Sequence, residues 1–448
     1  MKIENTATPK WEWIVVTGFL LVVALVGLRP SIRGNDGLGH YAYLASALSD
    51  GDLDLSDDYA ALDHWKDSSW FRDRPLSSTG RPVNRYGIGA ALFWSPFAGA
   101  VHYALQMLDP AAATTTGRPY EWAIGLGTVF WSSLALLLLY GRLRAGFGPM
   151  AAGLTLIGLL GATPLGFYVY LHGSMSHGVS FFAVTAAMMA TEMAWRHVRP
   201  GPYLLCGVCC GLMIMTRYQN LPWALVSALA LSLAAVRTAS GSRARRFGRV
   251  AFLMTVFIGA ATVAFLPQMS VWRVIYGSWL SGPAPYLGGL GGRLGLWPHH
   301  GLAVLFSERG GALAWHPILL LALAGLIALP RRRPAWRLIA LAGLGGFVLQ
   351  VWLIGSWSMW WGGASFGNRF FISCLPWMAG GMALWFSART GLRRTVAAGV
   401  LALLVAWNAG LLIQYGTQMI PRETSVPWGR VIRQNLTQVP VWVFERLF

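Results

Sequence analysis

A short polar run follows the first apolar segment of the sequence directly: GNDGLGHY, residues 34–41. Its carboxylate, Asp36, is expected where a membrane helix has just emerged into water. A carboxylate in that place can take a proton from the hydroxyl group of a reactant. It can act on a lipid-borne substrate and still reach a soluble partner. Asp36 is therefore the candidate catalytic base, and His40 and Tyr41 are candidate substrate contacts. The alternative is that Asp36 caps a helix expected over residues 38–48.

Three arginines lie where apolar segments meet polar connections: Arg85 in NRYG, Arg217 in TRYQN and Arg369 in FGNRFF. A guanidinium group donates paired hydrogen bonds to phosphate oxygens, so all three are candidates for holding a phosphate. Arg217 interrupts a long apolar run, where an arginine is costly unless it is paired or lies at an interface. The structural alternatives are a turn between two spans for Arg217 and an anchor at a helix end for Arg369.

Three further residues are candidate substrate contacts. His172 and His177 lie in the run HGSMSHGVS, which contains no carboxylate, and Glu308 is the only acid of residues 271–311. The histidines could orient a phosphate or a hydroxyl group, or they could simply be hydrogen-bonded residues at helix ends. Glu308 could orient a sugar or form a surface salt bridge. Since Mg²⁺ and Mn²⁺ prefer carboxylate ligands, no metal ligand is assigned, no cofactor is implied and dependence on a divalent metal is doubtful.

The composition indicates that lipid is the main solvent of this chain. Of its 448 residues 55% are hydrophobic and 12% are charged, about half of the charged share of a soluble domain. Apolar runs of about 20 residues recur, a length that spans a bilayer as helix. Because lipid cannot satisfy free backbone groups, the predicted fold is an all-α integral membrane bundle. The net charge of +18 is explained by arginines that flank helices on the cytoplasmic side, so no nucleic-acid partner is expected.

Eleven membrane-spanning helices are predicted. They cover residues 13–28, 121–140, 148–167, 177–195, 202–216, 219–236, 249–269, 312–330, 336–354, 370–388 and 394–413. Arg-rich short connections near residues 142–144, 196–199, 237–249, 331–337 and 389–394 mark the cytoplasmic side, so the N-terminus is also cytoplasmic. The apolar segment 86–108 would invert this order if it spanned the membrane, and it is therefore expected on the outer face, lying in the interface.

The whole chain, 1–448, is predicted to be one transmembrane domain of the plasma (inner) membrane. Its first extracytoplasmic region, 30–120, is expected to form juxtamembrane helices. Nine of the seventeen acidic residues lie in it between Asp36 and Asp73. Residues 271–311, which include Gly288, Gly289 and Gly291, are expected to form an outer flap over the site, or a plain mobile loop. Residues 415–448 are expected to rest on the membrane surface as a tail.

Six segments, taken in order, resemble the GT-C superfamily of polytopic glycosyltransferases, the relatives of protein O-mannosyltransferases and lipid A aminoarabinose transferases. They are NDGLGHYAYLASALSDGDLDLSDDY, NRYGIGAALFWSPFAGAVH, YLHGSMSHGVSFF, GLMIMTRYQNLPWAL, LFSERGGALAWHPILLLALAGL and WWGGASFGNRFFISCLPWMAGG. The resemblance implies an acid directly after the first helix, the position of Asp36, and an in-plane outer helix before the second span. Many relatives carry a second acid in the next outer loop, whereas this chain has His172 and His177 there.

The resemblance implies transfer of a sugar from a polyprenyl-phosphate donor to an acceptor hydroxyl on the extracytoplasmic side, with inversion. Asp36 would be the base, arginines would hold the lipid phosphate, and the acceptor could be a glycan, a lipid or a protein. One alternative is a polytopic lipid or glycan transporter or flippase, which would bury ionisable groups at mid-membrane and show repeated halves; neither feature is found in the sequence. Another is an enzyme of the O-antigen ligase or polymerase type, which would not need an acid after the first helix.

Overall fold

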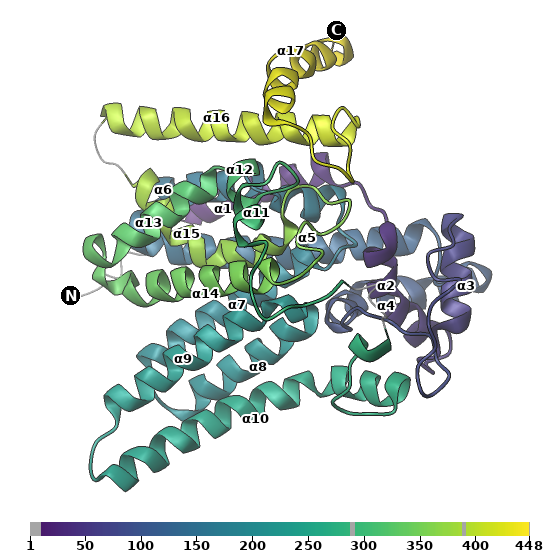
Figure 1. Ribbon diagram of the computed structural model, residues 1–448, viewed down its shortest axis with the longest axis horizontal. Helices are drawn as coiled ribbons and strands as arrows, with labels where there is room; N and C mark the ends of the chain where they lie inside the picture. Colours follow the sequence, from purple (N-terminus) through teal and green to yellow (C-terminus); the bar gives the residue numbers. More distant parts are fainter. Residues whose placement is uncertain (1–9, 287–291, 388–390, 448) are drawn as a thin grey trace.

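The computed structural model describes residues 10–286, 292–387 and 391–447, and within these ranges the fold is a helical bundle without β-strands, as predicted. Figure 1 shows most of the long helices lying roughly along one axis. Gly288, Gly289, Gly291 and Arg389 lie outside the described residues. The helices are α1 (Lys10–Gly27), α2 (Gly34–Ser49), α3 (Leu55–Lys66), α4 (Gly89–Leu108), α5 (Arg118–Phe147), α6 (Pro149–Gly161), α7 (His177–Arg196), α8 (Pro200–Thr216), α9 (Leu221–Thr238), α10 (Arg243–Tyr276), α11 (Gly301–Phe306), α12 (Ala312–Trp315), α13 (Ile318–Arg332), α14 (Arg337–Gly355), α15 (Leu375–Phe386), α16 (Gly391–Gly416) and α17 (Trp428–Leu447).

The chain is a multi-pass membrane protein. In the described ranges six helical segments are long and apolar enough to cross a bilayer, and three shorter apolar helices accompany them. Each of the eleven predicted spans contains a helix within the described residues, although short non-helical stretches interrupt the spans 148–167 and 312–330. The number of segments that cross the membrane stays a prediction. The six long segments are Arg118–Phe147, His177–Arg196, Tyr218–Thr238, Arg243–Tyr276, Pro334–Gly355 and Gly391–Gly416.

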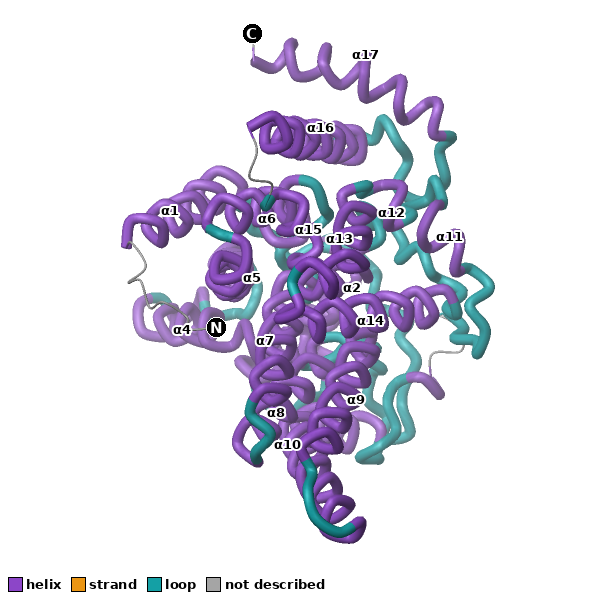
Figure 2. The backbone as a smooth tube through the Cα atoms, turned by 90° about the vertical axis from the view of Figure 1, so that its left-hand side faces the viewer, coloured by secondary structure: helices purple, strands orange, loops and turns teal. Residues whose placement is uncertain are grey.

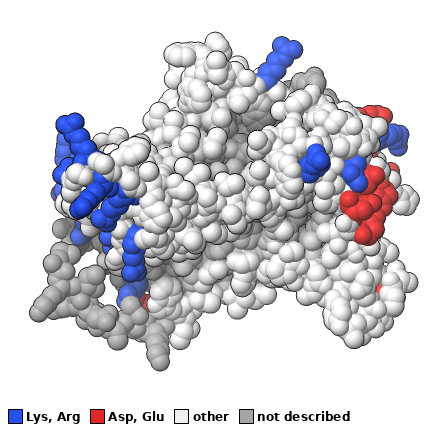
Figure 3. Space-filling model, turned by 90° about the horizontal axis from the view of Figure 1, so that it is seen from below, with Lys and Arg blue, Asp and Glu red and all other residues white. Residues whose placement is uncertain are grey.

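The two ends of the bundle differ in charge. The turns between α9 and α10 and between α13 and α14 carry Arg-rich runs, and both lie at the left of Figure 1, whereas α2 and α3 lie at the right. The face in Figure 3 likewise shows basic side chains gathered at one end and a patch of acidic side chains at the other. The Arg-rich connections thus gather at one end of the bundle, the end predicted to be cytoplasmic. The orientation of the protein in the membrane stays a prediction.

Helix α4, the segment that breaks the predicted alternation of spans, packs against α2, α8 and the N-terminal half of α5. His102 of α4 hydrogen-bonds Tyr120 of α5 (2.7 Å), and the Phe93 carbonyl of α4 accepts a hydrogen bond from Trp131 of α5 (2.8 Å). Because the earlier residue of α4 meets the later residue of α5, the two helices are antiparallel. The start of α4 lies against the C-terminal end of α8, at Met215 and Thr216. Helix α4 therefore stays at the acid-rich end of the bundle. Its placement in the membrane plane stays a prediction.

Buried polar contacts fasten α2 and α3 to the start of α5. Glu121 of α5 pairs with Lys66 at the end of α3 (2.6 Å) and accepts a hydrogen bond from the backbone N–H of Ile32, just before α2 (3.3 Å). The Glu121 side chain is 7% exposed, so its charge depends on these partners. The acid-rich region is thus held rigidly where the first apolar helix ends.

One acid of α3 is expected to make the stability of the protein depend on pH. Asp58 is buried, and burial, together with Asp57 and Asp50, raises its pKa to about 7. A carboxyl whose folded-state pKa is raised stabilises the fold while it is protonated, and this contribution is lost as the pH rises from about 4 to about 7. Asp58→Asn is therefore expected to raise the Tm at pH 8 by roughly 2–4 °C and to change it little at pH 4.

The measurement is thermal unfolding of detergent-solubilised protein at pH 4 and pH 8. Asp73→Asn, which removes an exposed carboxylate of the same region, is the matched control and should leave the Tm at both pH values unchanged. An equal effect of Asp58→Asn at both pH values would mean that packing, and not ionisation, sets its influence.

The C-terminal tail forms a helix that stands away from the bundle, as Figure 2 shows for α17. Gln414 of α16 donates a hydrogen bond to the Val431 carbonyl (3.2 Å) and also bonds Asn435, which joins the two helices. Helix α17 exposes Leu436 and Phe444, so its surface suits the predicted contact with the membrane interface. That contact stays a prediction.

Candidate active site

A cavity of about 510 Å³ lies at the acid-rich end, where the connections that follow α1, α3, α6, α8 and α14 come together. Four arginines and two carboxylates are among the side chains that line it. These residues are Arg33, Asp36, Arg85, Arg217, Arg369 and Glu423. With two more cationic than anionic groups, the cavity is suited to an anionic ligand.

Two glycines in the run GNDGLGHY allow α2 to reach this cavity. A Cβ atom at Gly37 would lie 2.6 Å from the Ser174 hydroxyl, and one at Gly39 would lie 2.2 Å from the ring of Tyr86, so neither position has room for a side chain. The backbone N–H of Arg33 donates to the same Ser174 hydroxyl (3.1 Å). Close backbone approach therefore places the first turn of α2 directly at the cavity wall.

Asp36 lies in that first turn, with its carboxylate lining the cavity. Arg369 is 2.7 Å from its Oδ2 atom, Arg85 is 3.6 Å from Oδ1, and the hydroxyl group of Tyr86 donates a hydrogen bond to Oδ1 (2.6 Å). The N-cap position belongs to Arg33, so the capping alternative for Asp36 is wrong. Its side chain binds cations and not the helix end.

The electrostatic environment keeps Asp36 ionised. Burial alone would raise the pKa of this carboxyl, but the charge of Arg369, the hydrogen bond from Tyr86 and the charge of Arg85 together hold the pKa well below its ordinary value. The carboxylate is therefore ionised at neutral pH and accepts hydrogen bonds.

The predicted arginines all reach the cavity, in different ways. Arg369 has a side chain only 13% exposed, and its Nε atom has no hydrogen-bond partner in the described residues. Arg217 donates from Nη1 to the Ser176 hydroxyl (3.0 Å) and to Nε2 of His177 (3.2 Å). Burial and the nearby Arg369 lower the pKa of Arg217 to about 9, which leaves it charged at neutral pH. Two guanidinium groups therefore face the cavity from separate elements.

Of the three histidines predicted to contact substrate, His40 and His172 line the cavity and His177 lies behind its wall. Nδ1 of His40 bonds the Gly87 carbonyl (3.0 Å), and His172 lies on another wall. Burial lowers the pKa of each to about 4, and Arg217 and Arg369 respectively add to the shift, so both are neutral at pH 7. His177 is buried against Arg217 and supports that arginine.

Besides His177, two other predicted substrate contacts are absent from the cavity wall. Tyr41 is buried, and its hydroxyl group donates to the Thr115 carbonyl (2.6 Å), so it packs the first outer region together. Glu308 accepts a hydrogen bond from the backbone N–H of Trp428 (3.1 Å) and lines a small adjoining cavity. The structure thus gives both residues packing contacts.

Three residues that line the cavity were not predicted from the sequence: Asn35, Tyr86 and Glu423. The hydroxyl of Tyr86 binds Asp36, and Asn35 accepts a hydrogen bond from Arg74. Tyr86 and Asn35 adjoin predicted residues in the runs NRYG and GNDGLGHY, so their motifs carried a signal. Glu423 comes from the tail after α16, and nothing local to that segment indicates that it folds back to the cavity.

The donor atoms around Asp36 do not suit a divalent metal ion. Within the described ranges no three His, Cys, Asp or Glu side chains gather in a way that could hold one. Asp36 is surrounded by guanidinium groups, and the other carboxylate of the cavity, Glu423, is on an exposed residue. Mg²⁺ and Mn²⁺ need several oxygen ligands and repel such cations.

Comparison with known proteins identifies the fold. No protein-family model matches the sequence, and no curated protein does. The structure matches the apo oligosaccharyltransferase of Archaeoglobus fulgidus (TM-score 0.50, 14% identity, 95% of this chain and 57% of that chain). It also matches ArnT from Cupriavidus metallidurans bound to undecaprenyl phosphate (TM-score 0.50, 16% identity, 91% and 72%).

Both solved proteins are membrane glycosyltransferases of the GT-C superfamily. This chain spans just over half the length of the archaeal enzyme. At identities this low the likeness is one of fold, and at that level the resemblance predicted from the sequence is confirmed.

Proposed function

We propose that this chain, which has the GT-C fold, is a glycosyltransferase that moves a sugar from a polyprenyl-phosphate donor to an acceptor hydroxyl. The observation that carries the proposal is the cluster of Asp36, Arg369 and Arg85 in a cavity that Arg217 also lines. It combines one ionised carboxylate with several cations at the end of an apolar helix bundle. The site would face the extracytoplasmic side of the plasma (inner) membrane.

In the proposed reaction the acceptor oxygen attacks the anomeric carbon of the donor sugar. A bond forms between these two atoms as the bond from the anomeric carbon to the phosphate oxygen breaks, and the configuration inverts. The hydroxyl proton passes to the carboxylate of Asp36. Although this carboxylate is a weak base, the hydroxyl becomes strongly acidic as its oxygen bonds to carbon, so a weak base is sufficient in the transition state.

The departing lipid phosphate needs positive charge and not a proton. Arg369 offers a guanidinium group from a largely buried side chain, and half-buried Arg217 offers a second one. Donors held in place in a poorly hydrated cavity stabilise developing negative charge strongly. The ArnT structure of similar fold is bound to undecaprenyl phosphate, which supports a lipid phosphate as the ligand here.

A transporter or flippase is less well supported. Such proteins place ionisable groups near the middle of the membrane, where both sides gain access to them in turn. The charged side chains of this cavity instead gather at one end of the bundle, where connections between helices meet. That arrangement favours chemistry at one membrane surface.

The direct test is sugar transfer by purified protein in liposomes that contain polyprenyl-phosphate sugars and a panel of glycan, lipid and peptide acceptors. The expected result is release of polyprenyl phosphate together with a glycosylated acceptor. Movement of the intact donor between leaflets, with no phosphate released, would instead identify a flippase.

Chelation of metal ions is expected to leave transfer largely intact. Since the groups around Asp36 are mainly cationic, the lipid phosphate is neutralised by arginines and not by a metal ion. Transfer should be compared in liposomes with and without EDTA, followed by addition of Mg²⁺ or Mn²⁺. Complete inhibition by EDTA that Mn²⁺ reverses would contradict the proposed role of the arginines.

A further inference from the structure

A second cavity, of about 520 Å³, lies between α1, α5 and α7, toward the Arg-rich end of the bundle. Its wall is mainly apolar and includes Trp13 from α1, Leu137 and Leu138 from α5, and Met189 and Met193 from α7. Leu138 is partly exposed on the flank of the bundle. Since α5 and α7 are both long and apolar enough to span a membrane, this cavity opens on a surface that lipid covers.

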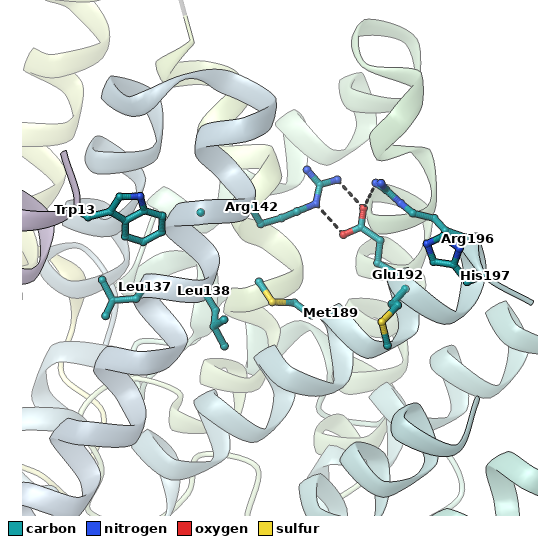
Figure 4. A pocket seen from close by; sticks show the side chains of 10 residues that line it. Trp13, Leu137, Leu138, Arg142, Met189, Glu192, Arg196 and His197 are labelled. Carbon is teal, nitrogen blue, oxygen red and sulfur yellow. Dashed lines mark hydrogen bonds and ion pairs between the residues drawn. The ribbon is translucent and has the colours of Figure 1, made fainter. Parts of the chain in front are cut away.

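Three charged side chains form the rim of this cavity. Figure 4 shows the carboxylate of Glu192 between two guanidinium groups. Arg142 binds both oxygens of Glu192, with Nε 2.7 Å from Oε2 and Nη2 2.6 Å from Oε1, and Arg196 binds Oε1 at 2.5 Å. Two cations thus share one anion, which leaves a net charge of +1 on the rim.

The two arginines differ in accessibility. The side chain of Arg142 is 19% exposed, and its guanidinium group also lies over the ring of Trp336 at 3.7 Å, so Arg142 is committed to protein contacts. The side chain of Arg196 is 51% exposed and has one ion pair within the described residues. His197, which follows it, also lines the cavity. Arg196 and His197 can therefore donate hydrogen bonds to a ligand without opening the Arg142–Glu192 pair.

We propose that this cavity binds one anionic phospholipid of the surrounding leaflet. The headgroup phosphate would accept hydrogen bonds from Arg196 and His197, and an acyl chain would lie against Leu137, Leu138 and Met189. A free inorganic anion would gain nothing from the apolar wall, and a zwitterionic lipid would gain less from the cationic rim. The site is separate from the proposed sugar-transfer site, and its test needs no sugar transfer.

The test is binding of phosphatidylglycerol and phosphatidylcholine to the full-length protein in detergent, measured by native mass spectrometry. The wild type is expected to retain phosphatidylglycerol preferentially. Arg196→Gln is expected to weaken that binding about five-fold, the loss typical of one cation at a lipid headgroup. Leu138→Trp keeps every charge but fills the apolar wall, and it should weaken binding as well.

Arg199→Gln is the matched control, because it removes the same charge from an exposed neighbour that does not line the cavity. It should leave lipid binding unchanged, and the Tm in phosphatidylcholine should show that each variant is folded. An equal loss with Arg199→Gln would point to diffuse surface charge and overturn the proposal. Unchanged phosphatidylglycerol binding by Leu138→Trp would also overturn the proposal. So would protein dimers in the mass spectra that form in place of the lipid-bound protein.

Discussion

Replacing Asp36 with asparagine is expected to lower the rate of sugar transfer by about 10²–10⁴-fold, the usual contribution of a positioned general base. Asparagine has nearly the same shape and can still accept the hydrogen bond from Tyr86, but it cannot take the proton of the acceptor hydroxyl. Donor binding should be unchanged or tighter. The variant removes a negative charge that would repel the lipid phosphate, and it frees Arg369 from its ion pair with Asp36.

The rate and the affinity for the donor should be measured on the same preparation, with Asp73→Asn as the control. Asp73 is an exposed acid of the same outer region and does not line the cavity, so its replacement should affect neither quantity. If Asp36→Asn transfers sugar at the wild-type rate, Asp36 is not the base. If the variant loses donor binding together with turnover, its main role is to position Arg369.

Replacing Arg369 with alanine is expected to weaken donor binding by about 2–4 kcal/mol, which corresponds to roughly 30- to 1000-fold in Kd. The buried lipid phosphate would lose a charged hydrogen-bond donor, and nothing at that position would replace it. The loss should be larger for the intact polyprenyl-phosphate sugar than for the free sugar, because the phosphate is the group that Arg369 is proposed to hold.

Affinity can be measured with a polyprenyl-phosphate sugar in detergent, and Arg72→Ala is the matched control. Arg72 is exposed in the same outer region and does not line the cavity that contains Asp36, so its removal changes the net charge equally without touching the site. A wild-type Kd for Arg369→Ala would refute its role in phosphate binding. Arg369→Lys should restore part of the affinity, since it returns the charge but not the paired donors.

The amino-acid sequence by itself determined the class of fold and predicted several residues of the candidate site. Long apolar runs form helices because lipid offers no partners to the backbone, so each of the eleven predicted segments contains a helix within the described residues. The arginines at alternate connections predicted which end of the bundle is cytoplasmic and which is extracytoplasmic. Asp36, Arg85, Arg217 and Arg369 could be selected because a charged residue beside an apolar segment is costly and seldom incidental.

Only the tertiary structure decided which of these residues meet. Asp36 and Arg369 are far apart in the sequence and lie 2.7 Å apart in the fold, because turns from different helices close on one cavity. Tyr41 and Tyr86 carry the same phenol group, and Glu308 and Glu423 the same carboxylate. Tyr86 and Glu423 line the cavity, whereas Tyr41 and Glu308 pack elsewhere. The physical reason is that the type of a side chain limits its chemistry, whereas its partners depend on how distant helices pack, which local sequence does not encode.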